Sequence, residues 1–317
     1  MNIFITGGLG ILGNSILKQL SNKNNKLIIY DRAKNYKRFL KIKKNNMKFV
    51  SGNLTNYKLI FKTIKNYKIN AVFHLGAQTQ VLDAIKYPYK TYLINLQSTI
   101  KLLEIARKIN DKIIFIYSSS DKAYGEVTKG SYLENYPLNS IYPYDVSKST
   151  SDLVAQSYSK TYSMRVGIIR SANIYGPYDR NTKRIVPETI INLLNKKKII
   201  IRSNGKLKRD YIFVDDVAKA YLLVFKELLK SKKKLLIYNV GSKDNLSVLQ
   251  IVNKIRSILK VKESSIKIAN NSKKEIKNQR LNYSKIKKDL KWKPKTTLYN
   301  GLKKTISWYK KNISEFN

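Results

Sequence analysis

Short apolar runs alternate with helix-length amphipathic segments along most of the chain, and this alternation is the strongest constraint on its fold. The expected strands are Asn2–Thr6, Lys26–Tyr30, Met47–Val50, Ala71–Leu75, Ile113–Ser118, Met164–Arg170, Ile199–Ile201 and Ile237–Val240. The expected helices are Leu12–Ser21, Leu59–Lys65, Tyr92–Lys108, Tyr144–Thr161, Val186–Asn195, Val214–Leu229, Val248–Leu259 and Leu302–Lys311. Several strands, such as IIFIY and LIIY, are apolar throughout, as strands covered on both faces should be. The sequence therefore predicts an α/β fold with a doubly wound parallel sheet.

The strand–helix alternation weakens beyond residue 170. We therefore expect a first domain over residues 1–170, to which a later stretch of about 205–240 returns. The rest of 171–317 is expected to form mainly a second, smaller domain packed on the first.

The composition excludes several classes of protein. Hydrophobic residues make up 43% of the 317 residues, which indicates a globular chain with a sizeable core. There is no cysteine, and the single histidine, His74, argues against a zinc site. No apolar run is long enough to span a membrane, and the N-terminus lacks the pattern of a secretory signal. We expect no metal, no membrane partner and a cytoplasmic location.

The formal net charge of +43 raises the question of a nucleic-acid partner. The basic residues occur in scattered groups, such as Lys196–Lys198 and Lys232–Lys234, and no single segment collects them. Lysine outnumbers arginine, although arginine is the residue that reads base edges with its planar fork. We therefore expect no nucleic-acid partner, although the charge can attract an anionic substrate.

Three glycines, Gly7, Gly10 and Gly13, follow the first strand at three-residue intervals. A strand, a glycine loop and a helix start suit a dinucleotide pyrophosphate, because bare backbone and helix N–H groups can approach its oxygens. Asp31, about 20 residues further on, is placed to accept hydrogen bonds from the adenosine ribose. Its charge repels a 2′-phosphate and so favours NAD over NADP, a preference that the adjacent Arg32 could soften.

Tyr144 and Lys148, in IYPYDVSKST, share one face of an expected helix. A tyrosine with its ordinary pKa near 10 is a poor base at neutral pH. A nearby ammonium, together with an oxidised nicotinamide, would lower that pKa by stabilising the phenolate. The tyrosine could then take a proton from a sugar hydroxyl while hydride leaves the same carbon. The spacing alone means little among 23 tyrosines, but its place after IIFIYSSSDKAYG gives it weight.

Six features occur in a fixed order: TGGLGILG, Asp31, SSSDKAYG, PYDVSK, RSANIYGP and RDYIFVDD. In order and spacing this set resembles the extended short-chain dehydrogenase/reductases, and within them the nucleotide-sugar epimerases and dehydratases. The similarity runs from Met1 to about Tyr309. It implies a Rossmann domain that binds NAD and a C-terminal domain that binds a nucleoside diphosphate sugar. Tyr144 and Lys148 would be the catalytic pair, and Ser120 would hydrogen-bond the 4-hydroxyl of the sugar.

The resemblance also implies the other cofactor contacts. They would come from Ile11, Leu12, Asn53, Leu54, Leu75, Gly76, Ala77, Asn95 and Ser118. The family usually has Gly-Asp near the adenine, where this chain has Gly52-Asn53, but an asparagine can still bond the adenine amine. His74 is expected to be a packed, hydrogen-bonded residue of the cleft wall and not a catalytic one.

Asp121 and Lys122 follow Ser120 directly. In 4,6-dehydratases these two positions usually hold an aspartate acid and a glutamate base, and the Asp-Lys pair resembles CDP-glucose 4,6-dehydratase. Oxidation at C4 makes the C5 proton acidic, and a lysine amine can remove it if burial and neighbouring cations lower the lysine pKa. Protonated Asp121 could then donate to the departing C6 hydroxyl. The alternative reading is a strand-end turn with a solvated ion pair.

The resemblance implies four substrate contacts. Asn173 and Arg209 would contact the diphosphate, where the planar arginine fork suits phosphate oxygens, and Arg184 would line the same cleft. Many relatives carry a further arginine near the C-terminus, for which Lys273 or Lys274 would substitute here without the fork.

The sequence thus favours a nucleotide-sugar 4,6-dehydratase over three alternatives. A 4-epimerase needs only Tyr144, Lys148 and Ser120, and a 4-keto sugar reductase would consume the reduced cofactor. A nucleic-acid-binding protein on a Rossmann scaffold would bind with a steep salt dependence. The nucleotide base and the sugar stay open. By family analogy, a homodimer would form through the helices Tyr92–Lys108 and Tyr144–Thr161.

Overall fold

The structure is a computed structural model, and it describes residues 1–21, 24–34, 45–126, 130–261, 266–270 and 276–316. Within these residues, seven strands form one sheet in the order β10-β6-β5-β4-β1-β2-β3, and all neighbouring strands are parallel. They are β1 (Asn2–Thr6), β2 (Lys26–Asp31), β3 (Met47–Ser51), β4 (Ala71–His74), β5 (Ile114–Ser120), β6 (Val166–Ser171) and β10 (Leu235–Val240). The prediction of a parallel sheet is confirmed.

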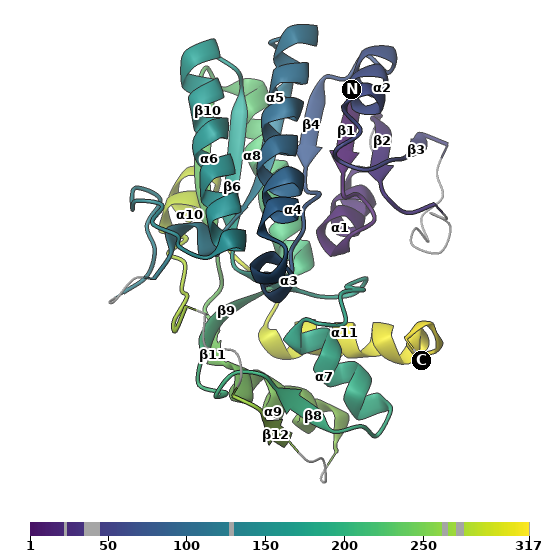
Figure 1. The fold of residues 1–317 in the computed structure, drawn as a ribbon, viewed down its shortest axis with the longest axis vertical. Helices are drawn as coiled ribbons and strands as arrows, with labels where there is room; N and C mark the ends of the chain where they lie inside the picture. The colour runs from purple at the N-terminus through teal and green to yellow at the C-terminus, as the bar shows by residue number, and fades with distance from the viewer. Residues whose placement is uncertain (22–23, 35–44, 127–129, 262–265, 271–275, 317) are drawn as a thin grey trace.

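Helices cover both faces of this sheet (Figure 1). On one face α1 (Ile11–Leu20) and α8 (Val214–Lys230) pack against each other. On the other face lie α2 (Tyr57–Asn66), α5 (Ser98–Ile109) and α6 (Pro143–Tyr162). The core is accordingly divided into two clusters, and neighbouring residues of β1 enter different ones: Ile3 the first and Phe4 the second. Because both faces are buried, the strand must be apolar throughout.

The strand order reverses beside β1, which lies between β2 and β4. In open parallel sheets, ligands bind at such a point, outside the carboxyl ends of the strands. The glycine loop follows β1, Leu75–Ala77 follows β4, and Asp121 and Lys122 follow β5. The topology therefore brings the main candidate residues to one edge of the sheet.

A smaller region lies below the large sheet in Figure 1. It holds the small sheets β11-β9-β7 and β12-β8 and three helices. The bounds are β7 (Asn173–Tyr175), β8 (Ile199–Ile201), β9 (Lys208–Phe213), β11 (Asn245–Ser247), β12 (Ile266–Ile268), α7 (Ile185–Leu194), α9 (Val248–Leu259) and α11 (Leu298–Lys311). Between these segments the chain returns to the large sheet through α8 and β10, beside which α10 (Ser284–Leu290) packs. We propose that this region is the second domain.

Residues Tyr92–Lys108 are helical throughout, as expected, but they do not form one regular α-helix. Two short helices, α3 (Val81–Lys86) and α4 (Pro88–Tyr92), lead into a π-helical turn, η2 (Leu93–Gln97), before α5 begins. Such turns are often found at functional sites. Asn95 lies in this one, and its contacts with distant residues are described below. The short strands β7, β9, β11 and β12 and the helices α3, α4 and α10 were also not expected, because segments of three to seven residues show little periodicity.

In the described parts of the chain, no helix is both long and apolar enough to cross a membrane.

Candidate active site

The glycine loop packs tightly against the loop after β4. Gly7 has φ of +65°, and a Cβ on it would lie 2.7 Å from the Cα of Gly76. A Cβ on Gly13 would lie 2.4 Å from the carbonyl oxygen of Gly8, where α1 crosses the loop. Neither position can accept a side chain without moving backbone. The loop therefore presents bare backbone beside the carboxyl ends of β1 and β4.

Helix α1 begins at this loop with Gly10 as its N-cap, which offers no side chain to the first N–H groups, those of Ile11, Leu12 and Gly13. There is also no acidic residue in the first turn. Uncapped N–H groups at a helix start suit a pyrophosphate. The carboxylate of Asp31 lies beside them, since its Oδ2 accepts a hydrogen bond from the Leu9 N–H at 3.1 Å. Arg32 is exposed. These residues fit a dinucleotide, and the contact of Asp31 with its ribose stays a prediction.

The other expected cofactor contacts lie in neighbouring loops. The side chain of Leu54 lies next to Gly76, and the Gly76 N–H donates to the Thr6 hydroxyl at 3.2 Å. Asn53 is exposed, and its carbonyl accepts from the Tyr30 hydroxyl at 2.7 Å. Leu75 and Ala77 flank Gly76 and are half-buried. The loops after β1, β3 and β4 therefore form one surface beside α1.

The Asn95 side chain makes its hydrogen bonds to other residues of the protein. Its Oδ1 accepts from the Gln78 N–H at 2.8 Å, and its Nδ2 donates to the Gln78 carbonyl at 3.0 Å and to the Ser147 hydroxyl at 2.9 Å. It is buried. The structure supports the view that Asn95 fixes α6, while its direct contact with cofactor stays a prediction.

His74 is a packed residue, as expected. Its ring nitrogens share hydrogen bonds with Thr6 Oγ1 at 2.8 Å and Thr99 Oγ1 at 3.1 Å. Burial, reinforced by the positive charge of Lys148, lowers the pKa of His74 to about 3. Because His74 stays neutral and both its ring nitrogens are hydrogen-bonded to other side chains, we interpret it as a structural residue of the cleft wall.

Tyr144 and Lys148 lie on the first turns of α6, which begins at Pro143, and both are buried. The Lys148 Nζ donates to the Ser118 carbonyl at 2.6 Å, and burial lowers the Lys148 pKa to about 8. Burial raises the pKa of the Tyr144 phenol. The positive charge of Arg184 and a hydrogen bond with Ser120 lower this pKa, but by less. In this structure desolvation dominates, and the opposing cation is Arg184; a lowering of the Tyr144 pKa by Lys148 together with a bound nicotinamide stays a prediction.

Ser120 ends β5 and caps the short 3₁₀ helix η3 (Asp121–Tyr124). Its hydroxyl accepts from the Lys122 N–H at 3.2 Å and donates to Asp121 Oδ1 at 3.0 Å. Asp121 is buried, its Oδ2 has no hydrogen-bond partner among the described residues, and burial raises its pKa. The alternative of a solvated ion pair is thus wrong for Asp121. Its buried carboxyl group is more readily protonated than an exposed carboxyl group would be.

The expected substrate contacts lie at different depths. Arg184 caps the start of α7, is partly exposed, and pairs with Asp179 at 3.3 Å. Arg209 is buried in β9, where it donates to the Ile276 carbonyl at 2.7 Å, and its charge reaches Asp121. Asn173, in β7, has a buried Nδ2 without a partner among the described residues. Lys273 and Lys274 lie outside the described residues. The charge of Arg184 thus acts on Tyr144 and that of Arg209 on Asp121.

The model of the NAD dependent epimerase/dehydratase family matches residues 3–241. The chain belongs to this family.

Individual members of the epimerase/dehydratase family are similar to the chain over nearly all its length. The dTDP-D-glucose 4,6-dehydratase of Bos taurus is 28% identical over 328 residues, which cover 98% of this chain and 89% of that protein. The crystal structure of a dTDP-glucose 4,6-dehydratase from Streptomyces venezuelae with NAD bound matches with a TM-score of 0.92 and 26% identity, covering 99% and 98% of the two chains. A UDP-glucose 4-epimerase from Thermotoga maritima matches with a TM-score of 0.88 and 26% identity, covering 99% and 100%.

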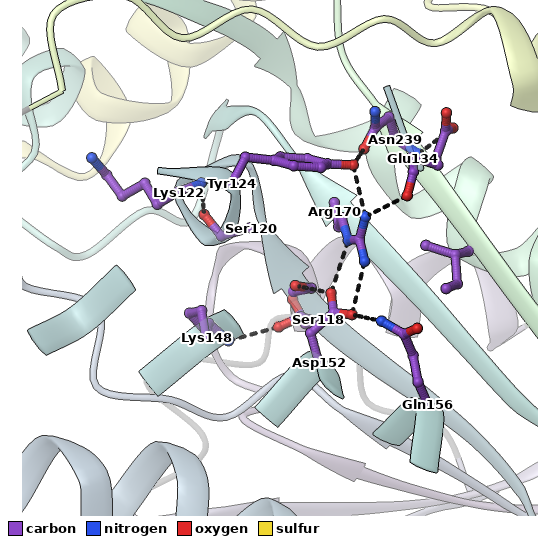
Figure 2. A network of polar contacts seen from close by, with 12 residues as sticks. Ser118, Ser120, Lys122, Tyr124, Glu134, Lys148, Asp152, Gln156, Arg170 and Asn239 are labelled. Carbon is purple, nitrogen blue, oxygen red and sulfur yellow. Dashed lines mark hydrogen bonds and ion pairs between the residues drawn. The ribbon is translucent and has the colours of Figure 1, made fainter. Parts of the chain in front are cut away.

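This family member has a buried polar network that sequence reasoning missed. Figure 2 shows Arg170 of β6 between Tyr124 and Asp152. Its guanidinium donates to both oxygens of Asp152 at 2.9 and 3.0 Å and to the Tyr124 hydroxyl at 2.8 Å. The network therefore ties α6, which carries Tyr144, to η3, which carries Asp121. The one available signal was an arginine within the apolar strand VGIIRS.

Gln279 was missed as well. It lies between β12 and α10 in sequence, and its Oε1 accepts a hydrogen bond from the Lys122 Nζ at 3.3 Å. A glutamine in a polar stretch such as KNQRLN carries no sequence signal for burial beside a lysine 157 residues away.

Proposed function

We propose that this chain is a nucleotide-sugar 4,6-dehydratase with NAD as its cofactor. The observation that carries the proposal is the pair on η3: a buried Asp121 that favours protonation, followed by Lys122 with its amine beside Gln279. Loss of water across two carbons needs an acid for the hydroxyl and a base for the neighbouring proton. The names of the relatives, several of them 4,6-dehydratases, favour the same reaction.

Bound NAD supplies the hydride acceptor for C4 and the hydride donor for C6. Tyr144 removes the proton of the 4-hydroxyl, which Ser120 orients. The C4 ketone makes the C5 proton acidic, and Lys122 removes it while Asp121 protonates the C6 hydroxyl, which leaves as water. Lys122 then returns a proton to C5 as hydride reaches C6. The product is a 4-keto-6-deoxy sugar, and NAD is not consumed.

The proton balance has a route through Ser120. At the end of the reaction Tyr144 has gained a proton and Asp121 has lost one. The Ser120 hydroxyl hydrogen-bonds both side chains. A proton can therefore pass from Tyr144 through Ser120 to Asp121, which restores both groups.

The diphosphate would be held by Arg184 and Arg209 and by Asn173, whose Nδ2 has no hydrogen-bond partner within the described part of the chain. Both arginines act electrostatically on the catalytic groups, Arg184 on Tyr144 and Arg209 on Asp121. An anionic substrate at this place would meet their charges directly. The nucleotide base remains to be identified, with CDP-, UDP- and dTDP-sugars as the candidates.

The test is a panel of CDP-, UDP-, dTDP- and GDP-sugars with purified protein and catalytic NAD, and products measured by mass. We expect one substrate to lose one water, and Lys122→Ala to abolish this loss, whereas Lys112→Ala, at an exposed site, should leave it intact. A product of unchanged mass that is insensitive to Lys122→Ala would instead establish a 4-epimerase. The likeness to the Thermotoga maritima 4-epimerase is the observation that favours this second candidate.

We also propose a homodimer formed through α5 and α6. Leu153 and Tyr162, on α6, expose 52% and 45% of their surface although they are apolar or amphipathic. Large apolar side chains exposed together on a surface often mark a site that another protein covers. Sedimentation of wild type and of Leu153→Asp would test it, with the monomer expected for the variant. The cytoplasmic location stays a prediction that cell fractionation would test.

A further inference from the structure

Gln279 is fully buried, which is unusual for a glutamine. Its Oε1 lies 3.3 Å from the Lys122 Nζ and accepts its hydrogen bond. A lysine ammonium can only donate, so the amide must turn its oxygen toward it. The Nε2 of the same amide is buried and has no hydrogen-bond partner among the described residues.

The backbone of Gln279 is fixed independently of Lys122. Its N–H donates to the Lys208 carbonyl of β9 at 3.1 Å, and its carbonyl accepts from the Asn245 Nδ2 at 2.7 Å. The next residue, Arg280, accepts at its carbonyl from the Tyr132 N–H at 2.8 Å. The backbone from which the amide extends is therefore held in place by contacts that do not involve Lys122.

A neutral partner is chemically suited to a lysine that must act as a base. An amide oxygen can orient the amine by one hydrogen bond without adding a negative charge. A carboxylate at the same place would stabilise the ammonium, which has no lone pair to accept a proton. Among the described residues, the charged or titratable groups around this corner are Asp121, Glu126, Tyr132, Arg209 and Asp210 of β9, and Tyr144 and Asp145 of α6.

We propose that Gln279 is a positioning residue, which aims the Lys122 amine at the sugar while leaving it free to lose its proton. The inference rests on the proposed function, in which Lys122 is the base. It assigns a positioning role to a residue from the C-terminal region, which contacts the proposed base at the edge of the large sheet.

The test compares Gln279→Glu and Gln279→Met with Gln250→Glu, which adds the same charge at an exposed site on α9. The readouts are kcat and KM for water loss, and the pH profile of both water loss and solvent exchange of the C5 proton, with NAD-loaded enzyme. For Gln279→Glu we expect the acidic limb of the profile to move up by about one pH unit, since a new carboxylate favours the ammonium. For Gln279→Met we expect kcat to fall about tenfold or more, with KM nearly unchanged.

An unmoved limb in a folded Gln279→Glu enzyme would overturn the inference. If that variant does not fold, Gln279→Met decides, because wild-type kcat would show that the amine needs no support from residue 279. A merely structural role would lower the melting temperature without moving the limb. If instead Lys122→Ala keeps water loss, the proposed function itself fails, whatever the Gln279 variants do.

Discussion

Arg170 and Asp152 form a bidentate ion pair at 2.9 and 3.0 Å, and both side chains are almost completely buried. Asp152 also accepts from the Ser119 hydroxyl and Arg170 also donates to the Glu134 carbonyl, so most of their polar capacity is used. Asp152 belongs to α6 and Arg170 also donates to Tyr124 of η3, so the pair links the elements that carry Tyr144 and Asp121 (Figure 2).

Loss of one partner should be costly. Arg170→Met leaves the Asp152 charge buried and uncompensated, and we expect a loss of about 3–5 kcal/mol in the free energy of unfolding. Urea denaturation measures it. Replacing both residues, as Arg170→Met with Asp152→Leu, should recover much of the loss, and Glu104→Gln, in the partly exposed pair with Arg107, should cost far less. A single variant as stable as wild type would contradict the structure.

Tyr144→Phe removes only the phenol hydroxyl. General base catalysis contributes about 10²–10⁴-fold, so we expect kcat to fall by that range while the melting temperature stays close to wild type. Tyr142→Phe, just before α6, is the matched control and should keep its activity. Activity within threefold of wild type for Tyr144→Phe, about 0.7 kcal/mol of barrier, would remove this residue from the mechanism.

We expect loss of the Lys148 proton to limit activity at high pH. Burial lowers its pKa to about 8, so the charged form dominates below that pH and is lost above it. We expect kcat/KM to decline above about pH 8. Lys148→Arg keeps the charge at all accessible pH values, and its weaker activity should lack this decline. An alkaline limb that is the same in both enzymes would assign the decline to another group.

His74 should make the protein less stable in mild acid. Its folded pKa is lowered to about 3, while the unfolded value is 6.5, so the unfolded chain binds the extra proton as pH falls. Stability is therefore lost progressively below pH 6.5, by about 2 kcal/mol at pH 5 for this group. Asp210 works in the opposite direction, since burial raises its pKa to about 7 and the folded state binds its proton more tightly.

The His74 contribution is isolated by difference. Denaturant unfolding of wild type and His74→Gln at pH 7 and pH 5 should show a smaller acid-induced loss in the variant, with Asp210 present in both. Equal losses in the two proteins would mean that His74 is charged in the folded state.

Asp31→Asn should weaken the discrimination against NADP. The asparagine keeps an acceptor for the Leu9 N–H but removes the charge that repels a 2′-phosphate. We expect the ratio of NADP to NAD affinity, measured by calorimetry, to rise about tenfold, which is about 1.4 kcal/mol. Asp111→Asn, at an exposed site, should leave the ratio unchanged. An unchanged ratio in Asp31→Asn would place the ribose elsewhere.

The sequence determined the parallel sheet and the residues at its edge because both are local properties. Apolar runs report strands buried on two faces, and Gly7, Gly13, Tyr144 and Lys148 lie within motifs whose spacing is set by one loop or one helix turn. The carboxyl ends of parallel strands lie at one edge of the sheet, so the residues that follow β1 and β5 lie at the same edge.

Only the tertiary structure decided the environment of these residues. Burial raises the Tyr144 pKa and lowers that of Lys148, and neither effect can be read from a four-residue spacing. The contacts of Arg170 with Asp152 and of Lys122 with Gln279 join residues 18 and 157 positions apart. Such pairs leave no periodic trace in the sequence, because it is the packing of whole elements that brings them together and removes water around them.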